Sequence, residues 1–306
     1  MRRFPFLAVI ITAALIAAAV LFLERVERRP DDSATRRAPG RETPKKAATG
    51  KTPGPGLGPA PPQTAHPGRP IAVIIDDIGF DLKIVEELAG IPAPIAFAVL
   101  PHAPHAAEAA RLLHAAGKEI LLHLPMEPRS YPGESPGAGA LMADMDEGEI
   151  RRQIREDLAA VPFVSGVNNH MGSRFMEDEA RLAIVMEELQ KRDLFFVDSR
   201  TTADSRGRES AGRAGVRFAA RDLFIDHAPG YAAALENLTG SFRQERSNGK
   251  PVLMIGHPHA QTVRAIRDAL PIWQTEGVRV IPISACLRIS SGAGKQDPFV
   301  KRQAER

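Results

Sequence analysis

The chain has 306 residues, which is enough for one large α/β domain or two small ones. Its formal net charge is +3, but the excess of lysine and arginine lies in residues 1–69 and 289–306, so residues 70–288 are net acidic. An enzyme that acts on nucleic acid concentrates positive charge on its folded part, so this distribution argues against a nucleic-acid partner. The single cysteine, Cys286, excludes an intrachain disulfide and a cysteine-ligated metal cluster.

Residues 1–29 have the composition of a membrane segment with flanking charges. Arg2 and Arg3 precede an uncharged, largely apolar run from Phe4 to Leu23, and charged residues follow it directly. A run of this length can cross the hydrocarbon core of a bilayer as one helix. The alanines at 17–19 leave a second possibility, a signal segment that is cleaved to release a secreted protein. We expect an anchor in the cytoplasmic (inner) membrane, with its N-terminus inside and the rest of the chain in the periplasm.

Residues 30–69 are rich in Pro, Gly, Ala, Thr, Lys and Arg and almost free of large apolar side chains. Such a segment cannot bury enough surface to fold, and its prolines favour an extended conformation. We expect a disordered linker there, a folded domain at 70–288 and a disordered tail at 289–306. The basic linker is suited to contact anionic lipid or an anionic wall polymer.

Apolar, strand-like runs alternate with amphipathic, helix-like stretches along the expected domain. The expected strands are 71–75, 95–100, 119–122, 163–167, 194–197, 223–225, 252–255 and 278–283. The expected helices are 81–89, 104–116, 147–159, 177–191, about 230–245 and 260–275. This alternation predicts a parallel sheet with crossover helices, and the number of units favours a barrel over an open sheet. No Gly-x-Gly-x-x-Gly and no phosphate-binding loop occurs, so nothing indicates a nucleotide. Cys286, near the last strand-like run, is expected to be a small buried residue.

Two carboxylates, Asp76 and Asp77, follow the first strand-like run directly. Adjacent aspartates repel, so a cation or a shared proton is needed to keep them together, unless one of them only caps the next helix. Polar residues also follow the later strands, namely Pro101-His102, His123 with Glu127, Asn168-Asn169-His170, Asp198-Ser199, Asp226-His227 and His257-Pro258-His259. The carboxyl ends of parallel strands share one rim of a barrel, so we expect these groups to face a single site.

Histidines and a carboxylate contributed by different strands form a typical site for zinc or a similar divalent ion. His123 follows an almost wholly apolar strand, and its alternative role is that of a hydrogen-bonded core histidine. His170 is a candidate ligand that could instead support a ligand or contact substrate. His257 and His259 could each be structural parts of a turn, and of the two we expect His257 to face the site. The histidines that we do not expect at the site are His66, His102, His105 and His114.

With these residues identified, the chain resembles the divergent polysaccharide deacetylases, relatives of the NodB-type carbohydrate esterases. The resemblance covers about residues 70–288. The segments that carry it are IIDDIG at 74–79, GKEILLHLPME at 117–127, NNHMGS at 168–173 and IGHPH at 255–259. The resemblance implies a distorted (β/α)7–8 barrel of the NodB type. It also implies a metal-dependent hydrolase that removes acetyl groups from N-acetylated sugars.

Position by position, the resemblance assigns Asp76 as the catalytic base and Asp77 as the metal-binding aspartate. His123 matches the first histidine of the family's His-x-x-x-His metal motif, and His257 matches a late histidine that looks like the general acid. The pairing of a base candidate and an acid candidate across one rim implies hydrolysis of an amide. Asp76 would take a proton from the attacking water, and His257 would protonate the leaving amine.

The chain departs from the family pattern at the second metal histidine, whose position is occupied by Glu127. Either Glu127 is itself a ligand, or His170 from the next strand completes the set with Asp77 and His123. We expect His170, because it is the histidine at that rim without another assigned role. The expected cofactor is one divalent metal ion, for which zinc is the expected choice, although the sequence does not identify the native metal. The reserve ligands and supporting residues are Glu127, Asn169, Asp198, Asp226 and His259.

Asp198 and Asp226 would orient histidines by accepting hydrogen bonds from them. A glycoside hydrolase fits less well, since it needs two separated carboxylates and gives no reason for several histidines at the rim. We therefore expect removal of N-acetyl groups from an envelope polysaccharide or glycan fragment. The alternative is a non-catalytic glycan-binding or scaffolding domain of the envelope that retains the deacetylase fold.

Overall fold

The computed structural model describes residues 69–241 and 250–290 of the chain. Within these ranges the strands are β1 (Arg69–Ile78), β2 (Ala96–Val99), β3 (Ile120–Met126), β4 (Val164–Met171), β5 (Phe195–Asp198), β6 (Phe218–Ala220), β7 (Leu223–Phe224), β8 (Val252–Gly256) and β9 (Val278–Val280). The helices are α2 (Leu82–Ala89), α3 (Ala106–Ala115), α4 (Glu147–Ala160), α5 (Glu179–Gln190), α6 (Gly207–Ala214), α7 (Tyr231–Glu236), α9 (Ala260–Thr275) and α10 (Ile283–Ser290). Two short helical turns, η1 (Phe175–Glu177) and η2 (Asn237–Ser241), complete the described elements.

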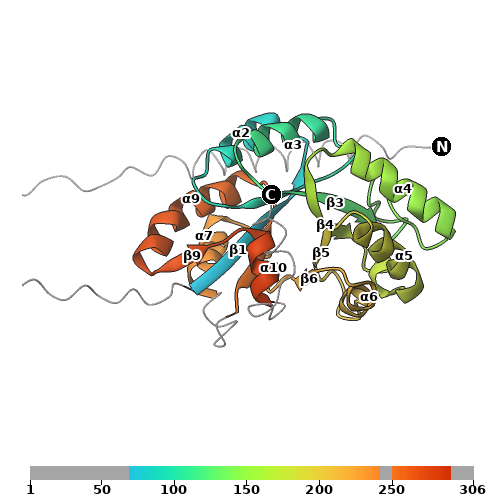
Figure 1. Cartoon of the computed structure of the whole chain (residues 1–306). Helices are drawn as coiled ribbons and strands as arrows, with labels where there is room; N and C mark the ends of the chain where they lie inside the picture. The colour runs from blue at the N-terminus through green and yellow to red at the C-terminus, as the bar shows by residue number, and fades with distance from the viewer. Residues whose placement is uncertain (1–68, 242–249, 291–306) are drawn as a thin grey trace, which may run out of the picture. The chain divides into compact units, whose positions relative to one another are not determined.

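The strands form one sheet in the order β6-β5-β4-β3-β2-β1-β8-β7, and every pairing along it is parallel (Figure 1). β9 pairs with the N-terminal end of β1. In the described part of the chain, β6 and β7 end this order and are not hydrogen-bonded to each other. Only Arg221 and Asp222 separate these two strands, and parallel neighbours need a crossover of a dozen or more residues. The prediction of a parallel α/β barrel is therefore confirmed in a coarser form, as a half-barrel.

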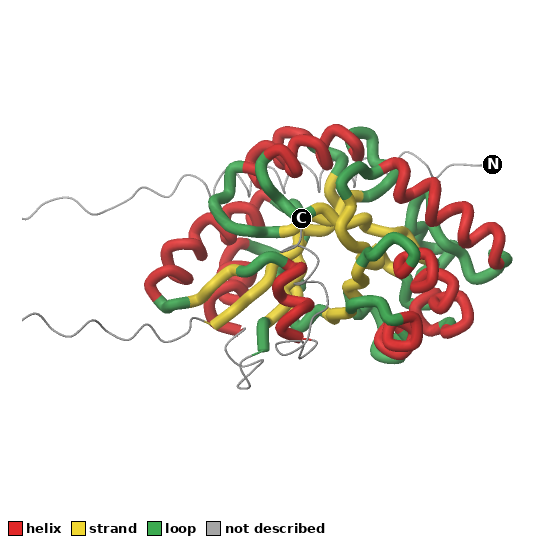
Figure 2. Tube along the Cα trace, viewed as in Figure 1, coloured by secondary structure: helices red, strands yellow, loops and turns green. Residues whose placement is uncertain are grey.

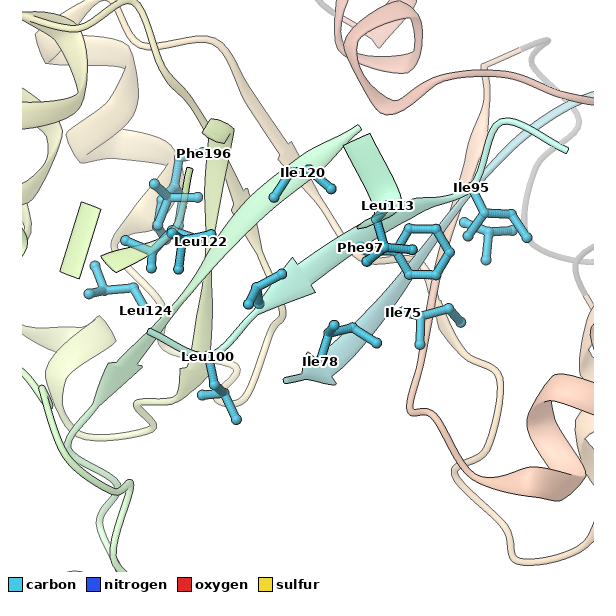
Figure 3. Close-up of a cluster of buried hydrophobic side chains, with 14 of the residues drawn as sticks. Ile75, Ile78, Ile95, Phe97, Leu100, Leu113, Ile120, Leu122, Leu124 and Phe196 are labelled. Carbon is cyan, nitrogen blue, oxygen red and sulfur yellow. The ribbon is translucent and has the colours of Figure 1, made fainter. Parts of the chain in front are cut away.

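Side chains of β1 alternate between two apolar cores because successive residues of a strand point to opposite faces. Val73 and Ile75 belong to the outer core between the sheet and the helices, part of which Figure 3 shows. Ala72 and Ile74 belong to the inner core on the other face of the sheet. A strand buried on both faces needs an uninterrupted apolar run, which residues 71–75 supply. The next position on the inner face is Asp76, so the alternation carries a carboxylate into the half-barrel.

Helices cover the outer face of the strands, as Figure 2 shows. Asp146 directly precedes helix α4 and caps it. Its side chain accepts from the backbone N–H of Glu149, and the Glu149 side chain accepts from the backbone N–H of Asp146. This reciprocal cap satisfies two N–H groups that a helix start leaves unpaired. Ile150 and Ile154, one turn apart, then place the apolar stripe of α4 against the outer core.

Helix α10 lies on the inner face of the half-barrel, between β1 and β6 (Figure 1). Ile283, Cys286 and Leu287 are buried there among residues of β1, β2, β5 and β8. The prediction of a strand over 278–283 was wrong at its end, because β9 stops at Val280 and the chain then turns into α10. Cys286 is buried as expected, but on a helix rather than near a strand.

Helix α6 has no counterpart in the sequence-based prediction. Its buried residues are Gly207, Ser210 and Ala211, which give no apolar stripe that periodicity could reveal. The helix ends at Gly215, whose φ of 70° is the left-handed conformation that glycine adopts easily. The predicted helix over about 230–245 is present as α7 followed by η2, and residues 242–249 lie outside the described residues.

The expected membrane segment, most of the linker and most of the tail lie outside the described residues. Among the described helices, none is both long enough and apolar enough to cross a membrane. β1 begins at Arg69 and α10 ends at Ser290, so regular structure extends slightly beyond both expected domain limits.

Candidate metal centre and active site

Asp76 and Asp77 lie within the carboxyl end of β1, where the pairing of β1 with β2 shifts register between Ile75 and Ile78. Asp77 has a φ of 55°, a left-handed conformation that is uncommon for a residue other than glycine. This irregularity interrupts the alternation of the strand, so that both carboxylates approach the same histidine. Asp76 Oδ2 lies 3.7 Å and Asp77 Oδ1 3.2 Å from His123 Nε2.

His123 lies in the middle of β3, and His170 lies near the carboxyl end of the neighbouring strand β4. His123 follows Leu121, which belongs to the inner core, by two positions, and is therefore on the inner face as well. His170 Nδ1 lies 3.1 Å from Asp77 Oδ1 and 3.1 Å from His123 Nε2. Three side chains from three strands thus bring one donor atom each to a common point.

Asp77 Oδ1 is buried and has no hydrogen-bond partner, although two imidazole nitrogens lie within 3.2 Å of it. A hydrogen shared between the nitrogens of His123 and His170 would satisfy those two atoms and leave this oxygen unpaired. A cation at the common point would satisfy all three. The separations approach the roughly 3.3–3.5 Å edge of a tetrahedral site with bonds of about 2.0–2.2 Å. Two imidazoles and one carboxylate therefore fit a small divalent ion.

Asn168 sets the protonation of His123 through two hydrogen bonds. Its amide Nδ2 donates to Asp76 Oδ1 at 2.8 Å, because a carboxylate can only accept. The amide oxygen is then left to face His123 Nδ1, also at 2.8 Å, and accepts its hydrogen. In the neutral ring, with its hydrogen on Nδ1, His123 Nε2 presents a lone pair toward Asp77 and His170, and this is the form that binds a metal.

Burial and neighbouring charges shift the pKa values of this cluster in different directions. Burial raises the pKa of Asp76, and the nearby His123 only partly offsets this effect. Burial acts in the same direction on Asp77, but the contacts with His123 and His170 outweigh it and hold its pKa well below the usual range. Burial lowers the pKa of His123, yet the carboxylates of Asp76 and Asp77 raise it to about 9. The two aspartates are thus electrostatically unequal.

His257 follows β8 and is held by Asp226. Asp226 Oδ1 lies 3.0 Å from His257 Nδ1, and Oδ2 accepts from the His257 backbone N–H at 2.7 Å and from Thr262 Oγ1 at 3.0 Å. Burial lowers the pKa of His257, but the Asp226 carboxylate raises it more, and the net shift is upward. His257 and Asp77 line the same surface hollow, so the imidazole faces the region of the metal site.

His259 lies with Asp226 and His257 in a second group of histidine and carboxylate donors. It is exposed and precedes α9 without a side-chain capping hydrogen bond. Both oxygens of Asp226 already accept hydrogen bonds in this group. The group therefore has no unsatisfied acceptor of the kind that Asp77 presents.

Glu127, the reserve ligand, does not join the three donors. Its Oε2 accepts from the backbone N–H of Ala143 at 2.5 Å and its Oε1 from Arg174 at 2.6 Å. The backbone oxygen of Glu127 also accepts from Arg174 and Phe175. Glu127 is thus a buried anchor for the loops after β3 and β4, and both of its carboxylate oxygens are occupied.

Asn169 and Asp198 support backbone rather than histidines. Asn169 accepts from the backbone N–H of Ser199 and donates to the backbone oxygen of Met171. Asp198 accepts from the backbone N–H of Arg200 and from Ser205 Oγ, so the expectation that it orients a histidine was wrong. Asp198 follows Val197 at the end of β5, and the side chain of Val197 lies on the inner face. Because successive side chains of a strand point to opposite faces, Asp198 points away from the inner face and toward its own loop.

Sequence reasoning overlooked the roles of Asn168 and Thr262. Asn168 lies two positions before His170 on β4, so strand alternation would have placed it on the same face as His170 and Asn169 on the other. That signal was present in the sequence. Thr262 approaches Asp226 only because α9 begins close to the end of β7, which no local pattern indicates.

Comparison with known proteins agrees with this geometry. A family model for divergent polysaccharide deacetylases matches residues 73–287. The uncharacterized protein YibQ of Escherichia coli K12 is 35% identical over 199 residues, which are 65% of this chain and 61% of that protein. An uncharacterized protein of Haemophilus influenzae Rd is 30% identical over 200 residues, 65% of this chain and 70% of that protein.

Among solved structures, the chain is similar to an uncharacterized protein of Agrobacterium tumefaciens C58, with a TM-score of 0.68 and 23% identity. The superposition covers 73% of this chain and 91% of that one, and it shows a shared fold. The family model spans nearly all of the described part of the chain, including the metal-site residues and His257. The chain therefore belongs to the divergent polysaccharide deacetylase family.

Proposed function

We propose that this protein is a metal-dependent hydrolase that removes N-acetyl groups from a glycan of the cell envelope. The observation that carries the proposal is the meeting of Asp77, His123 and His170 around a buried carboxylate oxygen without a hydrogen-bond partner. A general-base candidate, Asp76, lies beside this group, and a general-acid candidate, His257, faces it across a hollow. Family membership supports a polysaccharide as the substrate class.

Asp77, His123 and His170 would hold the divalent cation, for which we propose zinc. Such an ion, when bound, supplies a Lewis acid for the substrate carbonyl and the attacking water. The chain itself fixes the ligands: Asn168 holds the tautomer of His123, and the irregular end of β1 directs Asp77. His123 is buried, whereas Asp77 and His170 remain partly accessible, so substrate reaches the site from their side.

Asp76 is suited to act as the general base. Its Oδ1 accepts from Asn168, which fixes the carboxylate, while Oδ2 points toward the donor cluster at 3.7 Å from His123 Nε2. A water that attacks the acetamide carbon near this cluster would lose its proton to Oδ2. Because Asp77 and not Asp76 supplies the unsatisfied metal-facing oxygen, the two neighbouring carboxylates can divide the roles of ligand and base.

His257 is suited to donate a proton to the leaving amine. Its Nδ1 lies against Asp226, so the imidazole presents its other nitrogen away from that carboxylate. The same carboxylate favours the protonated ring, as the upward shift of the His257 pKa indicates. General acid catalysis of this kind contributes roughly 10²–10⁴-fold to rate.

We also propose that the domain acts outside the cytoplasmic membrane, held there by residues 4–23 or secreted after their removal. The uncharged run between basic residues supports this placement. A cysteine-poor domain with a large apolar core is compatible with export, since it needs no disulfide.

The test measures acetate release by purified full-length protein, in detergent, after chelation and after reloading with Zn²⁺. Substrates are N-acetylglucosamine oligomers and muropeptides. The native protein should release acetate only when reloaded. Asp76→Asn should retain the fold and the metal, because the amide oxygen can still accept from Asn168, and should lose turnover.

Acetate release that persists at full rate in Asp76→Asn would overturn the assignment of the base. Metal-loaded protein that binds oligosaccharide and never releases acetate would decide for a glycan-binding domain instead. A matched control is Asp146→Asn, which changes a carboxylate that caps α4 and should leave turnover unchanged.

A further inference from the structure

Two hollows adjoin Asp77, one on each side of the residue. One has a volume of about 400 Å³ and is lined by residues after β1, β2, β3 and β4, including His102, Pro136 and His170. The other has a volume of about 250 Å³ and is lined by residues after β1 and β8, including His257 and His259. Asp77 and Phe80 line both hollows. A ligand that spans them would therefore cross the proposed metal site.

Phe80 is the most exposed of the large apolar side chains in the described part of the chain, with 61% of its surface accessible. Its position is fixed by its neighbours. Gly79 has a φ of 125°, and a Cβ there would come within 2.6 Å of Ala103 Cβ, so only glycine allows this close turn. The backbone oxygen of Gly79 accepts from His105, and Asp81 caps α2. The backbone on both sides of Phe80 is thus fixed, and its exposed side chain lies at the border of the two hollows.

The chemistry of the hollows favours an uncharged ligand. Their walls include Leu100, Pro101, Pro125 and Ile84, with imidazole, hydroxyl and carboxylate groups at intervals. Of the described residues, no lysine or arginine lines either hollow. A third cavity, of about 390 Å³ at the opening between β6 and β7, differs in that arginines and a lysine line it together with Asp198, Glu209 and Asp222.

We propose that Phe80 is a platform for a sugar ring and that the two hollows bind successive units of an uncharged, N-acetylated sugar chain. This inference rests on the proposed function and adds the class and minimum length of the substrate. The acetamide to be cleaved would lie over Asp77, and the ring that carries it, or the next one, would stack on Phe80. An exposed aromatic face is suited to the C–H surface of a pyranose, and the polar residues at the edges of the hollows can bond to its hydroxyls.

The test compares Phe80→Ala with the native Zn²⁺-loaded protein on N-acetylglucosamine and its longer oligomers. The native protein should act better on oligomers than on the monomer. Phe80→Ala should raise KM for the oligomers by about 2- to 10-fold, the range that one aromatic contact provides, with little change in kcat. Phe80→Trp should restore the native KM. The matched control is Phe163→Ala, because Phe163 is also exposed but stacks on His114 and lines neither hollow.

A second arm compares the neutral oligomers with muropeptides that carry free carboxylates. Preference for the neutral chain supports the proposal, and equal or better use of the acidic chain overturns it. Unchanged KM in Phe80→Ala also overturns it, even where Asp76→Asn shows that the protein is a deacetylase. If no substrate releases acetate, calorimetric binding of the neutral oligomers still decides: weaker binding by Phe80→Ala supports the platform, and equal binding overturns it.

Discussion

Two groups of side chains in this protein have the same composition and different chemistry. Asp77, His123 and His170 bring one donor atom each to a common point, and so do Asp226, His257 and His259. In the first group a carboxylate oxygen is buried without a hydrogen-bond partner. In the second group both carboxylate oxygens accept hydrogen bonds from the backbone, a hydroxyl or an imidazole.

We infer from this difference that hydrogen-bond satisfaction, in addition to residue type, distinguishes the proposed metal site from the proposed proton-transfer pair. A satisfied carboxylate has little to gain from a cation and acts by orienting its histidine. An unsatisfied buried carboxylate is costly until a cation or proton reaches it. Each of the following predictions tests one consequence of this contrast.

The largest effect is expected for the first group. His123→Ala should lose nearly all bound Zn²⁺, because it removes one of three ligands, whereas His259→Ala should retain it. Metal content by mass spectrometry after dialysis provides the measurement. Since His123 is buried, Asp77→Asn gives a second variant that preserves volume and should also lose metal. Equal metal loss in His123→Ala and His259→Ala would show that the two groups do not differ.

The next effect concerns catalysis without metal loss. Asp226→Asn should reduce kcat by roughly 10²–10⁴-fold, because an amide cannot accept the hydrogen bonds from His257 N–H, His257 Nδ1 and Thr262 at once. Bound metal should stay at the native level. His257→Ala should give a similar kcat. Loss of bound metal in Asp226→Asn would mean that Asp226 supports the metal and does not only orient His257.

A smaller effect is expected at Asn168, which contacts a ligand without being one. Asn168→Ala should weaken Zn²⁺ affinity by about 10- to 100-fold, because His123 loses the acceptor that fixes its tautomer. Competition with a chelator measures this. Ser199→Ala is the control, since Ser199 Oγ lies 3.4 Å from the Asn168 amide and makes no contact with the histidine. Equal affinities in both variants would contradict the role of Asn168.

The smallest effect concerns Glu188, whose two carboxylate oxygens both accept hydrogen bonds, and tests whether such a carboxylate stabilises the fold. Burial raises the pKa of Glu188, but Lys191, Arg192 and Arg151 outweigh this and lower it to about 2. The folded pKa is below the ordinary value of 4.5, so the stabilisation exists above pH 4.5 and disappears as the pH falls toward 2. Glu188→Gln should lower the free energy of unfolding at pH 7 by about 1–2 kcal/mol, after allowance for the exposure of Lys191.

Urea unfolding at pH 7 and at pH 3 would measure the Glu188 effect. The difference between Glu188→Gln and the native protein should shrink at the lower pH. The control is Glu187→Gln, because Glu187 is exposed and contacts only Arg151 of these three cations. A difference that is the same at both pH values would mean that the Glu188 charge is not responsible.

The main strands and helices could be predicted from the sequence because each carries its own apolar pattern. Ile71–Ile75 and the stripe of α4 are examples. Helix α6 could not be predicted, since Gly207, Ser210 and Ala211 bury little apolar surface. The start of α10 was mistaken for the end of a strand because Val280, Ile281 and Ile283 are apolar and β-branched, although Pro282 between them marks the break.

At the site, the position of polar residues after successive strands led to the expectation that Asp77, His123 and His170 share a rim, and the three side chains do lie together. The sequence pattern could not predict hydrogen-bond partners that come from distant parts of the chain. Glu127 has the spacing of a ligand, but the loops after β3 and β4 supply N–H and guanidinium donors that no local pattern reveals. The pairing of Asp226 with Thr262 depends likewise on how α9 packs.

The position of β1 in the sheet has a consequence for the order of assembly during synthesis. β1 is made first among the described strands, yet β8, β9 and α10, made last, pair with it or pack on its inner face. A nascent chain that ends before residue 252 therefore leaves one edge and one apolar face of its central strand uncovered. The ribosome tunnel must release the final helix before the inner core can close, so truncations near the C-terminus should yield chains that chaperones retain.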